Sequence, residues 1–270
     1  MTPRRRTQGF TLLEMVIAIS ISAIVVIFAV MFIAAPVDAY EAHGRRANLV
    51  ADAATPWPRM QLDIRRALPN SVRQRRNGNF VVLEMLETVG YARFDAPPGA
   101  NFPVTGTAQG IFGHYQPGAT VAGHLSVGNI GAEAYTQTGS MTPRFNNIVL
   151  APNGAGGALV QPGGAVVLNQ ASPRSRVYLV RGFVAYLCDE GQGTMRRYEG
   201  TTIVANPVAH DAPAEFGGAL TELVARGLSS CSFDAPLVAG QPQIVTARIT
   251  TSRHNESVTL MHRAVVENRP

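Results

Sequence analysis

Lysine is absent from this 270-residue chain, and all 23 basic residues are arginine. The absence excludes a phosphate-binding loop with its lysine, a Schiff-base lysine and a lysine general base. The chain also has no G-x-S-x-G motif, and its glycine-rich stretch at 152–164 lacks the strand–helix context of a phosphate site. These absences predict a protein that is not an enzyme and that needs no cofactor.

Metal-binding patterns are also scarce. The six histidines have no zinc-site spacing: His43, His114, His124, His210, His254 and His262. Asp189 and Glu190 precede a glycine-containing turn, where hard oxygen ligands would suit calcium. An ordinary hairpin turn explains the same residues, so we predict no metal site.

Positive charge is concentrated at the N-terminus. The formal net charge is +5, and three of the positive charges belong to Arg4, Arg5 and Arg6. A second basic cluster, RQRRNGN at 73–79, has the charge to contact phosphates, but such runs are more often solvated junctions between elements. The charge balance is therefore weak evidence for a nucleic-acid partner, and we expect none.

One long apolar run follows the N-terminal arginines. From Phe10 to Ala35 the only charged residue is Glu14. A helix of about 26 residues spans about 39 Å, enough for a bilayer core of about 30 Å. The arginines in front place the N-terminus in the cytoplasm and the rest of the chain on the far side of the membrane.

Two ordinary explanations for the run are incomplete. A secretory signal peptide has a shorter apolar region of about 7–15 residues. A signal anchor fits the length, but it explains neither Gly9 nor Glu14. A carboxylate at the centre of a bilayer costs about 2.5–3.5 kcal/mol on insertion scales, so Glu14 needs a reason.

The stretch QGFTLLEMVIAISI, residues 8–21, resembles the leader and first helix of type IV prepilins. The resemblance implies that one membrane-embedded enzyme, a prepilin peptidase, cuts after Gly9. The same enzyme then methylates the new N-terminal amine of Phe10. The resemblance also implies that Glu14 meets the N-terminal amine of a neighbouring subunit in a filament, since two opposite charges in hydrocarbon attract strongly. The alternative is a carboxylate that snorkels to the membrane edge without a partner.

The remaining chain predicts an α+β fold. We expect a leader over 1–9, a transmembrane and assembly helix over 10–36, an amphipathic continuation over 37–70 and a β-rich domain over 71–270. Pro36 is expected to kink or reset the helix. Thr55 is a candidate N-cap for a second helical start before Pro56. Trp57, Met60, Ile64 and Leu68 form its packing face, and Asp63 is expected to pair with Arg59 or Arg66.

The β-rich domain shows an alternating pattern, which predicts strands with one buried and one solvated face. A strand, a turn at Gly90 and a short second strand are expected over 79–94. Two strands joined by a turn are expected over 175–200 and over 219–235, and a hairpin over 242–267 that turns at His254–Asn255. The Gly- and Pro-rich stretch 97–165 is predicted to be a loop-rich insertion lying on the sheet, with four aromatic anchors: Phe102, Phe112, Tyr115 and Tyr135.

The two cysteines, Cys188 and Cys231, are the smallest number that can form a disulfide. Because the domain is expected outside the cytosol, we predict that they are bridged. The alternative is a pair of separate buried thiols, which would behave as small apolar groups.

Several further segments, including VAYLCDEGQGTMRRYEG and LVARGLSSCSFD, resemble minor pilins of the mannose-sensitive haemagglutinin pilus. The resemblance covers 9–94 and 177–270 and implies a single-pass inner-membrane protein that later enters a pilus. Its partners would be membrane lipid, the processing enzyme, other pilin subunits and the assembly machinery. A minor pseudopilin of type II secretion and a membrane-anchored adhesin or DNA-uptake pilin are the alternatives.

Overall fold

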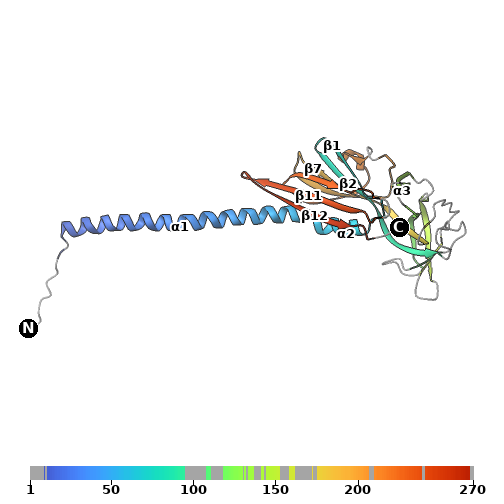
Figure 1. Ribbon diagram of the computed structural model, residues 1–270, viewed down its shortest axis with the longest axis horizontal. Helices are drawn as coiled ribbons and strands as arrows, with labels where there is room; N and C mark the ends of the chain where they lie inside the picture. The colour runs from blue at the N-terminus through green and yellow to red at the C-terminus, as the bar shows by residue number, and fades with distance from the viewer. Residues whose placement is uncertain are drawn as a thin grey trace, which may run out of the picture. The chain divides into compact units, whose positions relative to one another are not determined.

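The computed structural model describes residues 9, 11–94, 108–110, 118–129, 131, 133–136, 141–142, 144–152, 158–161, 172, 175–206, 210–238 and 241–267. The chain divides into two compact units, residues 1–48 and residues 49–270. Figure 1 follows the chain from the N-terminal helix to the C-terminal hairpin. The architecture is α+β, with an apolar N-terminal helix followed by antiparallel sheets, as the sequence predicts.

The first helix, α1, runs from Leu12 to Ala54 and contains Pro36. The expected reset of the helix at Pro36 is therefore wrong. A proline removes one backbone N–H donor and crowds the preceding turn, but the turns on both sides retain their own hydrogen bonds. The end of α1 belongs to the second unit, where Leu49 and Ala53 are buried.

The second helix, α2, spans Trp57–Arg65 and begins after a break at Thr55 and Pro56. Thr55 is not its N-cap, because the Thr55 hydroxyl donates back to the carbonyl oxygen of Ala51 at 2.8 Å. Residue Pro56 occupies the cap position without a side-chain hydrogen bond. The predicted packing face is confirmed for Met60 and Ile64, which are fully buried in one core with Trp57 packed against it. The prediction is wrong for Leu68, which lies beyond the end of α2 and is buried in a different core.

In the described part of the chain, nine strands form an antiparallel sheet in the order β1-β2-β3-β6-β5-β4-β7-β8-β9, with an additional pairing of β2 with β7. The pairings β2–β3–β6–β5–β4–β7–β2 therefore close into a circuit of six strands. The bounds are β1 Arg73–Asn77, β2 Phe80–Phe94, β3 Ala108–Gly110, β4 Thr120–Val127, β5 Phe145–Pro152, β6 Ala158–Gln161, β7 Arg176–Asp189, β8 Thr194–Gly200 and β9 Leu220–Arg226.

The stretch 97–165 contributes strands to this sheet instead of only lying on it. Its described strands β3 to β6 pair in the sheet, and a short helix, α3 (Glu133–Thr136), lies between β4 and β5. The prediction of a loop-rich covering layer is corrected to that extent. Tyr135 is buried, as expected of an anchor. Phe102, Phe112 and Tyr115 lie outside the described residues.

A second sheet has three strands, β10 (Leu228–Asp234), β11 (Ile244–Arg253) and β12 (Glu256–Val265). Residues 219–235 form two strands as predicted, but these strands do not pair with each other. The chain passes at Gly227, with φ of 74°, from β9 in the large sheet to β10 in the small one. The predicted turn at His254–Asn255 is confirmed, and both residues have positive φ.

The two longest strands, β2 and β7, pair along nearly their whole length. The turn expected at Gly90 is instead a register irregularity between Glu87 and Gly90, after which β2 continues to Phe94. Side chains of β2 alternate between two cores, with Leu83 and Met85 in one and Val82 and Leu86 in the other. The expectation of one solvated face is therefore wrong for these strands, because both of their faces are covered.

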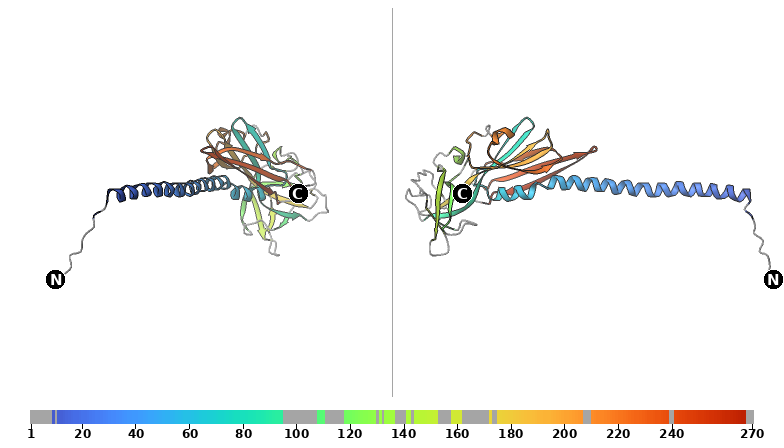
Figure 2. Two further views of the ribbon diagram at one scale, coloured as in Figure 1. Left: turned by 60° about the vertical axis from the view of Figure 1, so that its left-hand side comes forward. Right: turned by 180° about the vertical axis from the view of Figure 1, so that it is seen from behind.

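The first core lies between α2, one face of β2 and β7, and the small sheet. Figures 1 and 2 show α2 beside the β11–β12 hairpin, and Trp57 stacks on His262 with ring centroids 4.7 Å apart. The second core covers the opposite face of β2 and β7 and includes Tyr135 and Phe216, the latter in a short 3-10 helix, η2 (Pro213–Phe216).

The predicted disulfide is present and joins Cys188 of β7 to Cys231 of β10. Both cysteines are buried in the first core, so the bridge links the large sheet to the small one. The sequence separation of 43 residues makes the closed loop long, which is the arrangement that constrains an unfolded chain most in the entropy model.

Removing the bridge tests its contribution. Replacing Cys188 and Cys231 together by Ala is expected to lower the free energy of unfolding by about 4 kcal/mol in the chain-entropy model. The measurement is urea unfolding of the full chain in detergent. Either single replacement also breaks the bridge and should reach a similar loss, and a double variant as stable as the wild type would contradict the assignment.

Candidate functional site

The N-terminal end of α1 has the geometry of a capped helix. Thr11 precedes the first helical residue, and its hydroxyl oxygen accepts a hydrogen bond from the backbone N–H of Glu14 at 3.3 Å. Glu14 is the third helical residue, where exposed N–H groups favour a carboxylate. The T-x-x-E spacing of such a cap is visible in the sequence, and it gives Glu14 a local role that the sequence analysis missed.

The predicted processing residues stand directly before this cap. Gly9 is exposed, and apart from its chain neighbours no described residue has an atom within 4 Å of the position that a Cβ would take there. Phe10 lies outside the described residues. The structure therefore places Gly9 and Glu14 on either side of the helix start, and the roles of all three residues stay predictions.

The segment that follows is apolar and exposed. Leu12–Ile33 is a stretch of 22 residues that is long and apolar enough to cross a membrane. Its large side chains are exposed from end to end, from Leu12 at 83% to Phe32 at 82%. Uncovered apolar surface of this extent is unfavourable in water, so the segment requires a cover of lipid or protein.

A buried carboxylate ties α2 to the large sheet. Asp63 Oδ2 accepts hydrogen bonds from the Tyr186 hydroxyl at 2.6 Å and from Arg197 Nε at 2.7 Å. Arg59 Nε, the predicted partner, is 3.9 Å from the same oxygen. The expected surface pairing of Asp63 is therefore secondary, because its main partners come from β7 and β8.

This cluster, made of Asp63, Tyr186 and Arg197, continues along the sheet. Arg197 also donates to Glu199 at 2.7 Å, and Arg181 lies 3.5 Å from both Glu199 and Glu87. The charges alternate in sign from buried Asp63 and Arg197 to the more exposed Glu199 and Arg181. Opposite charges next to one another limit the cost of removing the buried members from water.

Burial and pairing shift the ionisation of these groups. Burial, together with the neighbouring Asp63 carboxylate, raises the pKa of Tyr186, so the phenol remains a donor. Burial alone would lower the pKa of Arg197, but its hydrogen bonds to Asp63 and Glu199 hold that pKa above the usual range. Burial also raises the pKa of Glu87, and the charge of Arg181 opposes that shift.

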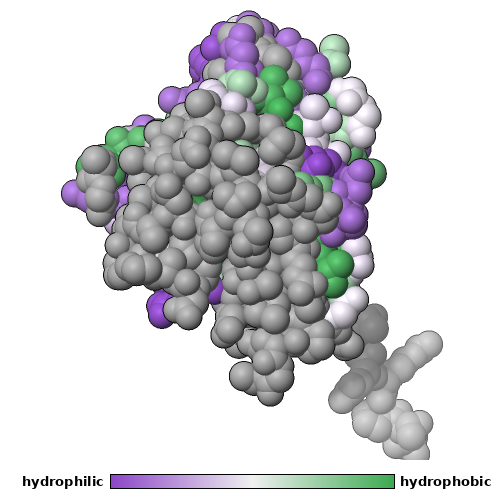
Figure 3. Space-filling view, turned by 90° about the vertical axis from the view of Figure 1, so that its right-hand side faces the viewer, coloured by the Kyte–Doolittle hydropathy of each residue, from purple (hydrophilic) through white to green (hydrophobic). Residues whose placement is uncertain are grey.

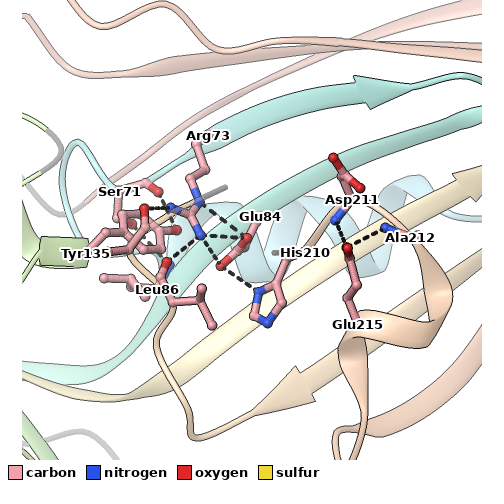
Figure 4. A network of polar contacts seen from close by, with 11 residues as sticks. Ser71, Arg73, Glu84, Leu86, Tyr135, His210, Asp211, Ala212 and Glu215 are labelled. Carbon is pink, nitrogen blue, oxygen red and sulfur yellow. Dashed lines mark hydrogen bonds and ion pairs between the residues drawn. The ribbon is translucent and has the colours of Figure 1, made fainter. Parts of the chain in front are cut away.

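The arginines of the 73–79 cluster are paired within the domain. Arg73 donates to both carboxylate oxygens of Glu84 at 3.0 Å, and Figure 4 shows this pair between Tyr135 and His210. The Arg73 guanidinium lies over the Tyr135 ring, 3.6 Å from its centroid, and Nδ1 of His210 is 3.3 Å from Glu84.

The other two arginines of β1 also have acidic partners. Arg75 donates to Asp211 at 2.7 Å, and Arg76 donates to Glu190 at 2.7 Å. The hydrogen bond from Arg76 lowers the pKa of Glu190. Because these charges are neutralised inside the domain, the cluster has little free charge for binding phosphates.

The carboxylates of Asp189 and Glu190 accept hydrogen bonds from other groups of the protein. Asp189 accepts from the Gln192 backbone N–H at 3.0 Å, and Glu190 accepts from Arg76 and from the Cys231 backbone N–H at 2.9 Å. These contacts favour the hairpin-turn explanation over a calcium site. Among the described residues, no group of three or more His, Cys, Asp or Glu has the geometry to hold a metal.

Outside α1, other described residues also expose large apolar side chains, among them Tyr91 at 40% and Leu220 at 75%. In the face drawn in Figure 3, the coloured residues show hydrophobic side chains in small separate groups among hydrophilic ones. Scattered groups of this size are normal on a soluble domain. Among the described residues, the longest run of exposed large apolar side chains is the one on α1, over Leu12–Ile33.

Comparison with known families gives one match. Residues 4–30 match the prokaryotic N-terminal methylation motif. No curated protein and no solved structure matches the chain. The match covers Gly9, Phe10 and Glu14 together with most of the apolar segment, which are the residues on which the predicted processing depends.

The Asp63 cluster can be tested by truncation. Replacing Asp63 by Ala removes one of the two acidic partners of the buried Arg197 guanidinium and leaves only Glu199. This loss is expected to lower the free energy of unfolding by about 3–5 kcal/mol. Urea unfolding of the full chain in detergent, followed by Trp57 fluorescence, measures the loss. The matched control is Arg59→Ala, which removes the exposed, more distant arginine at 3.9 Å from the same carboxylate and should cost about 0–1 kcal/mol. Equal losses of stability in the two variants would show that the hydrogen bonds of Asp63 to Tyr186 and Arg197 add nothing beyond its ion pair with Arg59.

Proposed function

We propose that this chain, a type IV prepilin-like protein, is a non-catalytic minor pilin that is cut after Gly9, methylated at Phe10 and built into a pilus. The observation that carries the proposal is the methylation motif followed directly by an exposed apolar helix. The helix anchors the precursor in the inner membrane, with the second unit on the far side.

Exposure of the Leu12–Ile33 segment supports assembly. In the membrane, lipid covers these side chains. In a filament, the same side chains are covered by the helices of neighbouring subunits, so transfer from lipid to filament keeps the apolar surface out of water. The segment therefore serves first as an anchor and then as a packing surface.

During that transfer, Glu14 fixes the position of the subunit relative to its neighbour in the filament. Cleavage after Gly9 creates a positive amine on Phe10, one residue before the Thr11 cap. A carboxylate in hydrocarbon is costly alone and is stabilised by a positive partner. We infer that the partner in the filament is the amine of a neighbouring subunit, whereas the helix N-terminus stabilises Glu14 before assembly.

The size of the second unit favours a minor subunit over a major one. A major pilin repeats at close spacing along a shaft, whereas this unit contains two sheets and an additional set of strands from the 97–165 stretch. Together with the segments that resemble the mannose-sensitive haemagglutinin pilus, this supports a role like that of its minor pilin MshO, at initiation or near the tip.

The test is Glu14→Ala in cells that make the pilus. We expect cleavage and methylation to proceed as in the wild type, and the amount of the chain in sheared filaments to fall about tenfold, the effect of losing about 1.4 kcal/mol of pairing. Immunoblots of membranes and filaments give both quantities. Glu41→Ala, which removes an exposed acid of the same helix, is the matched control.

The outcomes separate the proposal from its nearest alternative. Normal incorporation of Glu14→Ala would show that the carboxylate does not set the register. If deletion of the chain stops secretion of folded enzymes and leaves pili intact, the chain is a minor pseudopilin of type II secretion instead.

A further inference from the structure

The outer edge of β12 carries a row of backbone groups without a neighbour in the sheet. The hairpin has a two-residue turn, so Arg253 and Glu256 exchange hydrogen bonds, and every second pair after them does the same. The bond from Val266 N to Gln243 O at 3.0 Å continues this series. The N–H and C=O groups of the alternate residues therefore point away from β11: Ser257, Thr259, Met261, Arg263 and Val265.

These outward groups are unpaired in the described structure. Among the described residues, none hydrogen-bonds to the backbone of those five positions. All five side chains are exposed. A strand edge of this length usually carries a proline, a bulge or a covering element, and β12 has a regular register over all ten residues.

The opposite edge of the same sheet is closed. The N–H of Leu228 in β10 donates to the carbonyl of Gly193 at 3.0 Å. The Arg76–Glu190 pair binds both backbone groups of Cys231, because Glu190 accepts from its N–H and Arg76 donates to its carbonyl, each at 2.9 Å. Within the part of the chain that the structure describes, the β10 edge is thus closed by hydrogen bonds and the β12 edge is not.

Side chains beside the open edge combine positive charge with an apolar centre. Met261 is 55% exposed and stands between Arg263, two residues along the strand, and Arg248, its register partner in β11. Both arginines are exposed, and neither has an ion-pair partner among the described residues. At the strand end, Ile244 and Val265 are paired and also exposed.

We propose that the edge of β12 binds an extended, acid-bearing segment of a different pilin-type subunit as an added strand. The inference rests on the proposed function and names one contact of that assembly. Backbone hydrogen bonds to the five outward positions supply the affinity, and side chains select the segment. An acidic residue pairs with Arg248 and Arg263, and a neighbouring apolar residue covers Met261.

Charge identifies the occupant. Two unpaired arginines beside the edge favour a negative segment and disfavour a positive one. A second copy of β12 would bring its own Arg248 and Arg263 to the same surface, so like charges would meet across the new pairing. The partner is therefore a different subunit and not another copy of this chain.

The backbone part of the proposal is tested with Thr259→Pro in the full chain. Proline removes an outward N–H that β11 does not use, so the ladder within the hairpin remains. Thr259→Val is the matched control, because it also loses the hydroxyl contact with Thr250 but keeps the N–H. We expect the proline variant to fall about tenfold below the valine variant in sheared filaments, with an intact Cys188–Cys231 bridge in both.

The charge part is tested with Arg248→Glu combined with Arg263→Glu, against Arg196→Glu, an exposed arginine of β8, as the control. The double reversal should lower incorporation about tenfold or more, since like charges then face the acidic segment. A photo-crosslinking residue at position 261 should join the chain to another pilin-type subunit through a peptide containing Asp or Glu, and one at position 196 should not.

Three results would overturn the inference. They are equal incorporation of Thr259→Pro and Thr259→Val, crosslinks from position 261 to copies of this chain alone, and the absence of any subunit adduct there. In each case the wild-type chain is still found in filaments, so the proposed function stands. If the wild-type chain never enters filaments, the proposed function fails as well, and the two failures are distinguishable.

Discussion

The apolar side chains of Leu12–Ile33 are the constraint on which the rest of the molecule depends. Among the described residues, none covers these side chains, and their exposure to water is unfavourable. They therefore need a cover from outside the chain, which in the proposed account is lipid in the precursor and other helices after processing. In the same account, the helix N-terminus stabilises the Glu14 carboxylate before assembly, and the amine of a neighbouring subunit does so in the filament.

In the proposed account, the second unit has to remain folded while the anchor changes its surroundings. It does so with contacts that cross between its layers. Asp63 joins α2 to β7 and β8, the Cys188–Cys231 bridge joins the two sheets, and Thr251 holds the carbonyl of Leu49 at 2.9 Å. The end of α1 is thereby part of the folded core, so the helix and the domain share a continuous backbone.

Much of this arrangement could be predicted from the sequence, because it depends on local sequence patterns. Gly9 and Glu14 around an apolar run, alternating strands and the His254–Asn255 turn each depend on a few neighbouring residues. Pro36 did not indicate the end of a helix. It lies inside α1, because the loss of one hydrogen bond does not end a long helix. Likewise Gly90 marks a bulge, because β7 continues to pair beyond it.

The rest could not be predicted because it depends on contacts between distant residues. Asp63 lies on the buried face of its helix between Met60 and Ile64, and Glu84 interrupts an apolar strand. Each position signals a buried charge, but neither reveals that Arg197 or Arg73 is the partner. The strands β9 and β10 belong to different sheets, and this also depends on tertiary contacts. A strand–turn–strand pattern in the sequence does not show whether the two strands pair with each other.

The central claim is that this chain is a processed subunit and not a permanent anchor. Intact-mass measurement of the protein isolated from its native membrane and filaments tests it most directly. The account predicts a polypeptide that begins at Phe10, carries one additional methyl group and is two hydrogens lighter for the disulfide. Recovery of the mature protein with its first nine residues still attached and no methyl group would contradict it.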